Sequence, residues 1–401
     1  MLLRKPLTEL DVKKSYFFFS ALALGVMGWF QHHTLIDPAE LQTASIQTST
    51  SAVASAPHPS EVRLSYIDGG SIPMPSDTPA AHASALLAMP SQHPAEMLAF
   101  WFAGKRESAP DVQIYYSAFD RHAQRWLPAQ SVVERHDLAK QLGQGVRRIG
   151  NPVAWLDVDR RVHLFVVATG LGGWAASRIV HLKQIQQADT DVLADLRFEV
   201  VGMLPMSWLF NTSYLVRTGP VSLADGGMAL PVYFEIGNKH PTMAWFGPKG
   251  EFRGLTHMTQ RQTYLQPAVV AVTPTDWIGF LRDYDAQHIG VVSSQDAGRH
   301  WHDEPSLSLP NPNASVAVAK HGAWPVFFLA YNPSTQNREH LTLAMSNDAK
   351  SWHDVQLVEQ GGTGEEYSYP ALWVVENTLW LSYTDQRKRI AWRRYQIGAK
   401  S

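Results

Sequence analysis

From residue 61 onward, the sequence is a succession of short runs rich in Val, Ile, Phe, Tyr and Trp, each closed by Gly, Pro, Asn or Asp. Runs of this length, with turn residues between them, favour a series of β-hairpins over helices. The 27 glycines and 25 prolines of the chain agree with frequent turns. The pattern therefore predicts an all-β fold. Examples of such runs are 97–104, 162–170, 230–237, 276–283, 324–332 and 379–384.

A short signature recurs in the expected turns. Ser294–Trp301 reads S-x-D-x-G-x-x-W, Ser346–Trp352 is one residue shorter, and Ser117–Trp126 is a looser copy. In such a segment the Asp accepts hydrogen bonds from turn amides and the Trp packs over the turn, so we expect a structural role. The interval of about 50 residues between the two better copies matches a four-stranded propeller blade, and six or seven blades would fit. A pair of β-sandwiches is the alternative.

The pattern of the first sixty residues predicts a targeting segment and a linker rather than part of the folded domain. Lys13 and Lys14 precede an apolar run at 16–30, which suits a signal-peptide core better than a full membrane span. We expect a signal peptide or signal anchor at 1–33, a flexible linker at 34–60, and the folded domain at 61–401. The expected location is the periplasmic side of the inner membrane, held only by the N-terminal segment. A cleaved segment would instead leave a secreted or periplasmic protein.

Charge and cysteine content exclude several classes of function. The 34 Lys and Arg against 36 Asp and Glu give a formal net charge of −2, so no global basic field exists to bind nucleic acid. The chain contains no cysteine, which excludes disulfides, thiolate nucleophiles and Cys-ligated metals. The 17 histidines form no H-E-x-x-H motif. We therefore expect neither a metal site nor a cofactor.

The turn signatures, together with ordered segments along the folded part, resemble the sialidase (neuraminidase) superfamily, and more narrowly its bacterial members with BNR or Asp-box repeats. The resemblance covers about residues 61 to 395 and implies a six-bladed β-propeller with the active site on its axis. The segments that carry it are 82–90 (HASALLAMP), 99–117, 150–155 (GNPVAW), 230–235, 266–272 (QPAVVAV), 281–285 (LRDYD), 309–313 (LPNPN), 337–348 and 365–372 (EEYSYPAL).

The chemistry of sialidases explains which residue types to look for. Their sugar carries a carboxylate beside the anomeric carbon, and planar guanidinium groups bind a carboxylate best. A carboxylate nucleophile would be repelled by that charge, whereas a neutral tyrosine is not. A tyrosine nucleophile needs a neighbouring carboxylate to accept its proton.

The resemblance assigns these roles to individual residues. Asp111 is similar to the acid/base aspartate, and Tyr367, in the segment Glu366-Tyr367-Ser368, to the nucleophile. Tyr369 lies two residues on, so it has the same side-chain direction in a regular strand and is an alternative nucleophile. Three further residues resemble the arginines that bind the substrate: Arg106, Arg282 and Arg338.

Two positions depart from the family pattern. His82 begins the segment in which the family has an Arg-Ile-Pro motif, and Gln266 falls where a glutamate normally activates the tyrosine. Glu235 or Glu366 could replace that glutamate. A purely structural role is the alternative for Arg282 and Arg338, because each has an acidic neighbour with which a surface ion pair could form.

The sequence thus predicts an exported sialidase-like glycoside hydrolase that acts on a terminal sugar of a glycan, acidic or otherwise. Because of the changes at Gln266 and His82, a propeller that binds glycans without cleaving them is the alternative from another class. A structural subunit of an envelope polysaccharide system is the third interpretation.

Overall fold

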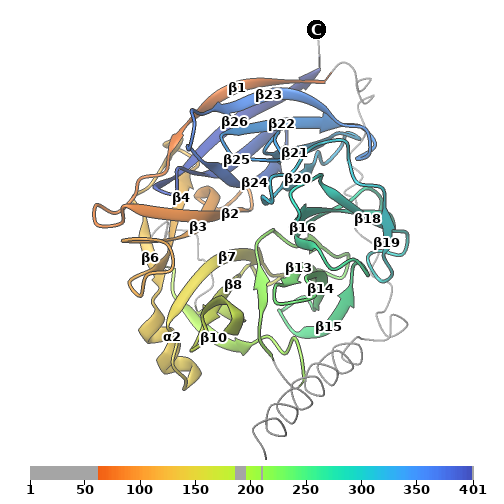
Figure 1. Ribbon diagram of the computed structural model, residues 1–401. Coiled ribbons are helices and arrows are strands. Elements are labelled where there is room, and N and C mark those ends of the chain that lie inside the picture. Colours follow the sequence, from red (N-terminus) through yellow and green to blue (C-terminus); the bar gives the residue numbers. More distant parts are fainter. Residues whose placement is uncertain (1–61, 186–195, 209–210, 400–401) are drawn as a thin grey trace, which may run out of the picture.

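The computed structural model describes residues 62–185, 196–208 and 211–399, and these form a six-bladed β-propeller (Figure 1). The prediction of this fold is confirmed. Six antiparallel sheets surround one axis. Five of them begin on the chain with their innermost strand, and the sixth takes its outermost strand from the start of the described chain. The expected signal segment 1–33 and linker 34–60 lie outside the described residues. Within the described ranges, no helix is both long and apolar enough to cross a membrane.

The first three blades, from the innermost strand outward, follow one another along the chain. Blade 1 contains β2 (Ala80–Ala88), β3 (Ala95–Gly104), β4 (Gln113–Asp120) and β5 (Arg125–Trp126), with β6 (Gln130–Val133) also paired to β4. Helix α2 (Arg135–Leu142) leads to blade 2, which contains β7 (Arg148–Leu156), β8 (Val162–Thr169), β9 (Ser177–Gln184) and β10 (Phe198–Met203), with the 3-10 helix η3 (Gly173–Ala176) before β9. Blade 3 contains β11 (Tyr214–Val216) and β12 (Val221–Ser222), both paired to β13 (Met228–Phe234), then β14 (His240–Phe246) and β15 (Phe252–His257).

The last three blades each contain four strands. Blade 4 contains β16 (Tyr264–Ala271), β17 (Trp277–Asp283), β18 (Gly290–Ser294) and β19 (His302–Glu304). Blade 5 contains β20 (Ala317–Lys320), β21 (Phe327–Tyr331), β22 (His340–Ser346) and β23 (His353–Gln360). Blade 6 contains β24 (Tyr367–Val375), β25 (Thr378–Asp385), β26 (Arg389–Ala399) and, outermost, β1 (Val62–Ser71).

The hydrophobic core is a ring of layers between adjacent blades rather than one central core. Each blade buries both of its faces, which explains why β3 and β8 are apolar almost throughout instead of alternating. The layer between blades 6 and 1 is rich in aromatic rings, with Phe119 in edge contact with Trp380 at a centroid distance of 4.9 Å. Burial between blades therefore selects the continuous Val, Phe and Trp runs seen in the sequence.

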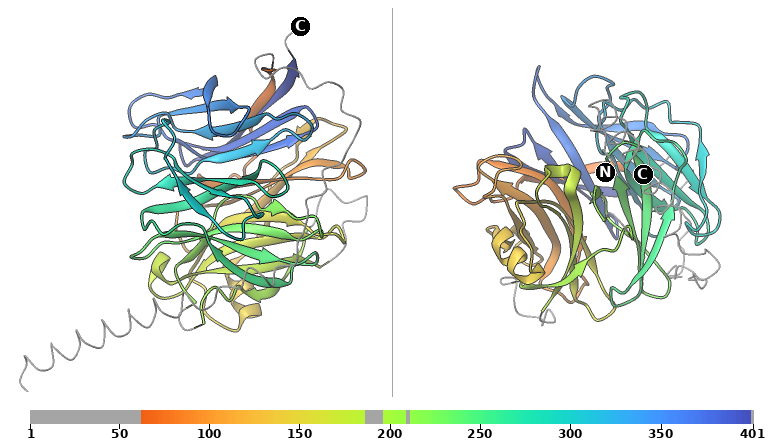
Figure 2. Two further views of the ribbon diagram at one scale, coloured as in Figure 1. Left: turned by 90° about the vertical axis from the view of Figure 1, so that its right-hand side faces the viewer. Right: turned by 60° about the horizontal axis from the view of Figure 1, so that its bottom comes forward.

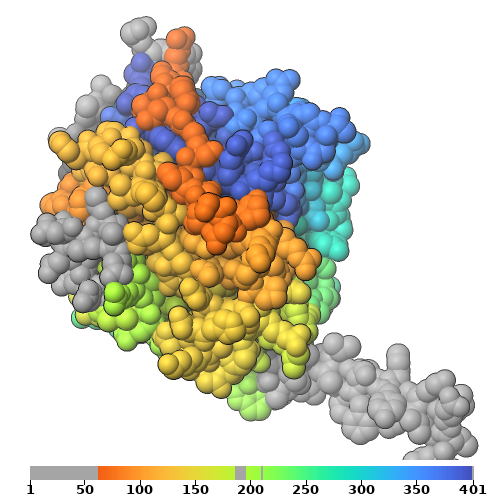
Figure 3. Space-filling model, turned by 90° about the vertical axis from the view of Figure 1, so that its left-hand side faces the viewer, coloured from red at the N-terminus to blue at the C-terminus, as the bar shows by residue number. Residues whose placement is uncertain are grey.

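Blade 6 closes the ring by joining the two ends of the described chain. β1 pairs antiparallel with β26, from Val62 opposite Ala399 to Ser71 opposite Ala391. Figure 2 shows β1 in orange beside the dark blue β26, and Figure 3 shows the same strand lying on the surface against the blue C-terminal blade. The first and last strands therefore hold one sheet together.

The Asp-boxes close the turns between the third and fourth strands of their blades. Asp296 Oδ1 accepts hydrogen bonds from the amides of Arg299 (3.1 Å) and His300 (2.8 Å), and Trp301 donates to the Gly298 carbonyl. Asp348 accepts from two amides in the same way between β22 and β23, as does Asp120 between β4 and β5. These interactions give the signature the structural role that its residue types predict.

We expect Asp296→Ala to lower the free energy of unfolding by about 1–3 kcal/mol, because the turn amides lose a charged acceptor. Asp296→Asn keeps an oxygen at the same place and should cost less than half as much. Urea unfolding followed by tryptophan fluorescence measures both. Equal losses in the two variants would show that the turn depends on the negative charge and not on the acceptor atom.

Candidate active site

Each innermost strand has, at or just before its start, one non-glycine residue with a positive φ angle. In four of the blades the sheet register shifts at this residue, which marks a β-bulge, and a bulge redirects a side chain away from the regular alternation of the strand. Because all six innermost strands begin at the same end of the axis, these residues form a ring there. They are Ala83 (φ 55°), Asn151 (42°), Ser213 (64°), Gln266 (45°), Asn313 (54°) and Tyr369 (54°).

Three arginines from three different blades converge on this end of the axis. In antiparallel blades, the end of the second strand and the turn to the third lie at the same end as the start of the first. Arg282 ends β17 in blade 4, Arg338 precedes β22 in blade 5, and Arg387 lies in the turn between β25 and β26 in blade 6. We call this group, with Glu366 and Tyr369, the central site.

Tyr369 is the half-buried phenol at the middle of the central site. Arg282 Nη1 donates to its hydroxyl at 3.3 Å, and the ring of His82 packs on its ring at a centroid distance of 4.2 Å. Burial alone would raise the pKa of Tyr369, but the positive charges of Arg282 and Arg338, with hydrogen bonds from Gln266 and Arg282, bring that pKa below its usual value of 10. The site therefore makes the phenolate easier to form than it is in a free tyrosine.

Polar side chains fix Arg282 in place. Its Nε donates to Asn313 Oδ1 at 2.6 Å, and its Nη1 donates to Gln266 Oε1 at 3.0 Å. The amide nitrogen of Gln266 donates in turn to the hydroxyl of buried Tyr233 at 3.1 Å. Two of these residues, Gln266 and Asn313, belong to the ring of positive φ angles, and Gln266 lies at a bulge, so this backbone conformation helps to orient the guanidinium.

Glu366 holds two of the arginines together. Its carboxylate accepts hydrogen bonds from Arg338 Nη1 (3.0 Å), Arg387 Nε (2.7 Å) and Ser368 Oγ (2.6 Å). Burial would raise the pKa of Glu366, but the bonds from Arg387 and Ser368 and the charges of Arg387 and Arg338 lower it to about 2. The residue therefore remains a carboxylate at any ordinary pH and is poorly suited to accept a proton from a tyrosine.

Glu235 has the opposite character. It directly follows β13, is largely buried, and no hydrogen bond of its carboxylate occurs among those of the described residues. Burial raises the pKa of Glu235, and the charges of Arg282 and Lys239 offset this only in part. Its charge also acts on Tyr233, whose hydroxyl contacts Gln266. Of the two glutamates considered from the sequence, Glu235 is the one suited to exchange a proton.

His82 lies under Tyr369 as a neutral ring. It is 3% exposed, and neither ring nitrogen has a hydrogen-bond partner. Burial, followed by the charge of Arg387, lowers its pKa well below 6.5. His82 therefore supplies no positive charge where the family motif has an arginine, whereas Arg387, which reaches the same region from blade 6, does.

The structure separates Tyr367 from Tyr369. Tyr367 packs in the layer between blades 5 and 6, and its hydroxyl contacts Glu365 Oε2 at 3.3 Å. The bulge that begins after Ser368 breaks the two-residue alternation, so Tyr369 turns instead toward blade 1 and the arginines. The sequence-based expectation of a shared direction fails because that bulge lies between the two side chains.

Arg106 and Asp111 are exposed on the loop between β3 and β4. The carboxylate of Asp111 accepts a hydrogen bond from the Lys105 amide at 2.9 Å, and within the described residues none of its hydrogen bonds reaches the central site. Glu107, on the same loop, does reach it and forms an ion pair with Arg387 Nη1. The loop thus brings a carboxylate to the site, but through Glu107.

Two arginines that sequence reasoning missed shape the site: Arg387, described above, and buried Arg217. Arg217 donates to the carbonyls of Ser84 (3.0 Å), Tyr369 (2.5 Å) and Pro370 (2.9 Å), and burial lowers its pKa to about 10, so it remains charged at neutral pH. It ties the innermost strands of blades 1 and 6 together under the phenol. A charged residue directly after the apolar run Tyr214–Val216 was the only signal in the sequence.

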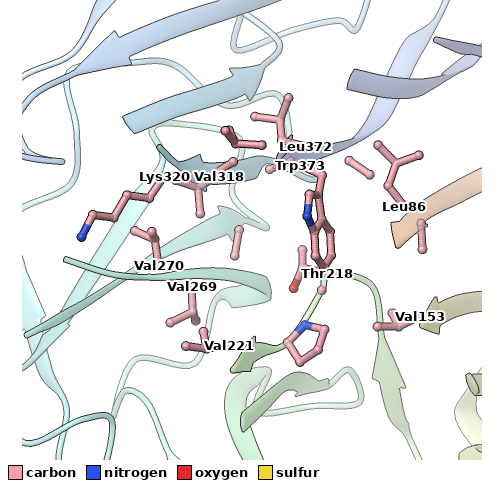
Figure 4. Close-up of a pocket in the computed structure, with 18 of the residues that line it drawn as sticks. Leu86, Val153, Thr218, Val221, Val269, Val270, Val318, Lys320, Leu372 and Trp373 are labelled. Atoms are coloured by element: carbon pink, nitrogen blue, oxygen red, sulfur yellow. The ribbon is translucent and has the colours of Figure 1, made fainter. Parts of the chain in front are cut away.

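An apolar channel continues along the axis beyond the ring of positive φ angles (Figure 4). It measures about 490 Å³ and is lined by residues that follow the bulges on their strands, among them Leu86, Val153, Val269 and Leu372. The indole of Trp373 stands within it, while the amine of Lys320 points away. The lining of this channel is mostly apolar, although Arg217, Thr218, Ser222 and Lys320 also contribute to it. No cluster of His, Asp and Glu suited to a metal ion occurs among the described residues.

Comparisons with known proteins agree with this fold. The family description "BNR repeat-like domain" matches residues 95–381. The fold is similar to Hadza microbial sialidase Hz136 (15% identity, TM-score 0.63, 80% of this chain and 66% of that one) and to Trypanosoma rangeli sialidase (11%, 0.63, 83% and 59%). It is also similar to a protein of unknown function from Dyadobacter fermentans DSM 18053 (10%, 0.64, 84% and 99%). None of the curated protein sequences matches this chain.

The fold and its Asp-boxes define a sialidase-like β-propeller with BNR repeats. Because the family match covers more than half of the sequence, the chain belongs to the BNR repeat-like domain family. The chain spans less than two thirds of the two sialidases named above, and at 10–15% identity these neighbours share the fold alone.

Glu366 should make stability depend on pH in a defined window. Its pKa is lower in the folded protein than the ordinary 4.5, so the stability it contributes is complete above about pH 4.5 and is lost as pH falls toward 2. Glu366→Gln should remove that dependence and lower the free energy of unfolding at neutral pH by roughly 1–3 kcal/mol. Urea unfolding at a series of pH values tests this, with Glu365→Gln as the matched control. Parallel pH profiles for wild type and Glu366→Gln would contradict it.

Proposed function

We propose that this protein is an exported glycoside hydrolase that removes a terminal acidic sugar from a glycan. The observation that supports it most is the partly buried phenol of Tyr369, which Arg282 contacts at 3.3 Å and whose pKa the surrounding guanidinium groups lower. A tyrosine made more nucleophilic and placed among cations suits a sugar whose own carboxylate would repel a carboxylate nucleophile. Export rests on the basic and apolar N-terminal sequence.

The arginines of the central site would bind the carboxylate of the sugar. Arg387 Nη1 is paired with Glu107, whose side chain is about four-tenths exposed, so an incoming carboxylate can displace Glu107 more easily than the less exposed Glu366. The displaced Glu107 loses its cationic partner and lies beside a second negative charge. A general acid must carry a proton, so Glu107 would act in this role as its carboxylic acid.

The reaction then follows from these positions. The phenolic oxygen of Tyr369 bonds to the anomeric carbon as the bond from that carbon to the glycosidic oxygen breaks, and Glu107 protonates the departing oxygen. Glu235 accepts the phenolic proton. Water next attacks the anomeric carbon, Glu107 takes a proton from it, the bond to Tyr369 breaks, and Glu235 returns its proton to the phenol. Asp111 could replace Glu107 only by releasing the Lys105 amide.

A glycan-binding protein without catalysis is the second candidate. Gln266 is the polar side chain beside both Tyr369 and Arg282, and an amide cannot accept the phenolic proton. In this alternative the same arginines bind an acidic sugar, and the phenol only packs and hydrogen-bonds against it. The two candidates differ in turnover and not in the chemistry of recognition.

Replacing each tyrosine separately distinguishes the nucleophile. Tyr369→Phe should lower kcat/KM by roughly 100-fold or more, equivalent to about 2.7 kcal/mol, whereas Tyr367→Phe should leave it within a few-fold of wild type. The assay is release of phenol from aryl glycosides of N-acetylneuraminic acid, glucuronic acid and galactose. Sugar binding without turnover in every variant would favour the binding protein, and a larger effect of Tyr367→Phe would overturn the assignment of Tyr369.

The ionisation of Tyr369 can be measured without any substrate. The near-ultraviolet absorbance of tyrosinate should show one tyrosine that titrates below pH 10, and this step should be absent from Tyr369→Phe. Arg338→Met should move the step to higher pH, because one positive charge near the phenolate is lost. Identical titrations for wild type and Tyr369→Phe would contradict the proposed activation.

A further inference from the structure

A second cavity opens at the same end of the propeller as the central site, on blade 2. It measures about 460 Å³ and lies between the segment that joins α2 to β7 and the loop that joins β8 to β9, near α2 in Figure 1. The start of β7 and the end of β8 lie at the end of the axis where the innermost strands begin, which places the cavity there. We call it the blade 2 cavity.

The lining of the blade 2 cavity combines cations with apolar surface. Arg178 donates through Nη1 to Gln144 Oε1 at 3.1 Å, so its guanidinium bridges the two walls and is held in place. Arg147 is exposed and also lines it, and none of the described residues that line the cavity is acidic. Leu171, 76% exposed, and Met203 supply apolar surface. Guanidinium groups beside apolar atoms suit an acidic sugar, which carries a carboxylate and a C–H-rich ring face.

One loop connects this cavity with the central site. Trp174, in η3, donates through its indole nitrogen to Ser108 Oγ at 3.2 Å. Ser108 is the neighbour of Glu107, which pairs with Arg387. Trp174 also lies close to Gly150, beside the positive-φ residue of blade 2, so its ring forms part of the wall around the axis. The loop therefore contacts the β3–β4 loop next to Glu107 through Trp174, while its residues Gly170, Leu171 and Ala176 line the blade 2 cavity.

We infer that the blade 2 cavity is a second sugar subsite, which binds another acidic residue of the same glycan chain whose terminal sugar occupies the central site. This rests on the proposed recognition of an acidic sugar and extends it from one residue to an acidic oligosaccharide. The chain would pass over Trp174, whose indole offers a stacking surface. The substrate class is therefore an anionic glycan of at least a few residues.

Binding to the full-length Tyr369→Phe protein tests this independently of turnover. Isothermal titration with oligosialic acid and with oligogalacturonic acid, each as monomer and as trimer, compares one subsite with two. We expect a trimer of one series to bind at least about tenfold more tightly than its monomer. Adding Arg178→Ala should remove about tenfold of the trimer affinity and leave monomer affinity unchanged.

Control variants distinguish the effect of a positive charge in the blade 2 cavity from the effect of a positive charge elsewhere on the surface. Arg125→Ala removes an exposed arginine at the Asp-box end of blade 1 and should leave both affinities unchanged. Arg178→Lys keeps the charge and should retain part of the trimer affinity. Equal affinity for monomer and trimer, no effect of Arg178→Ala, or an equal loss in Arg125→Ala would each overturn the second subsite. If no aryl glycoside is hydrolysed but trimer binding depends on Arg178, the proposed catalysis is wrong and the second subsite is supported.

Discussion

The central site depends on placing several guanidinium groups close together without their repulsion opening the propeller. Two unit charges 4 Å apart repel by about 4 kcal/mol at an effective dielectric constant near 20. Glu366 lies between Arg338 and Arg387 and hydrogen-bonds to both, while the neutral oxygens of Gln266 and Asn313 accept from Arg282. The arginines are thus oriented before any ligand arrives, and little reorganisation remains to be done when an anion binds.

The backbone conformation also determines which side chains reach the central site. At the innermost strand of each blade one residue has a positive φ angle, and three of the six precede proline: Asn151, Gln266 and Tyr369. These bulges change which way a side chain points, and they bring residues from separate blades onto the axis. Propeller geometry therefore supplies the convergence, and the bulges decide which side chains take part in it.

The fold could be predicted from patterns of neighbouring residues, whereas the positions of the site residues depend on parts of the chain that are far apart in sequence. The Asp-boxes and the apolar runs of β3 and β8 could be interpreted from neighbouring residues alone, because turn hydrogen bonds and burial between blades act over a few positions. The placement of Tyr369 could not, because strand alternation gives Tyr367 the same direction until the bulge intervenes. Arg387 lies in a turn rich in charged residues, a pattern that is typical of exposed turns. It comes close to His82 only because blade 6 packs against blade 1 when the propeller closes. The repeated X-Pro on the innermost strands was the available signal.

The pairing of β1 with β26 has a consequence for how the chain acquires its structure. These strands are the most distant in sequence of all the described pairs, so blade 6 needs the largest loop closure in the molecule. Blades 1 to 5 are each made of consecutive strands, whereas the last sheet needs both the first and the last of the described strands. Glu366, Tyr369 and Arg387 all belong to that sheet or its turns. The sheet that needs the longest loop closure therefore also supplies the carboxylate, the phenol and one of the guanidinium groups of the central site.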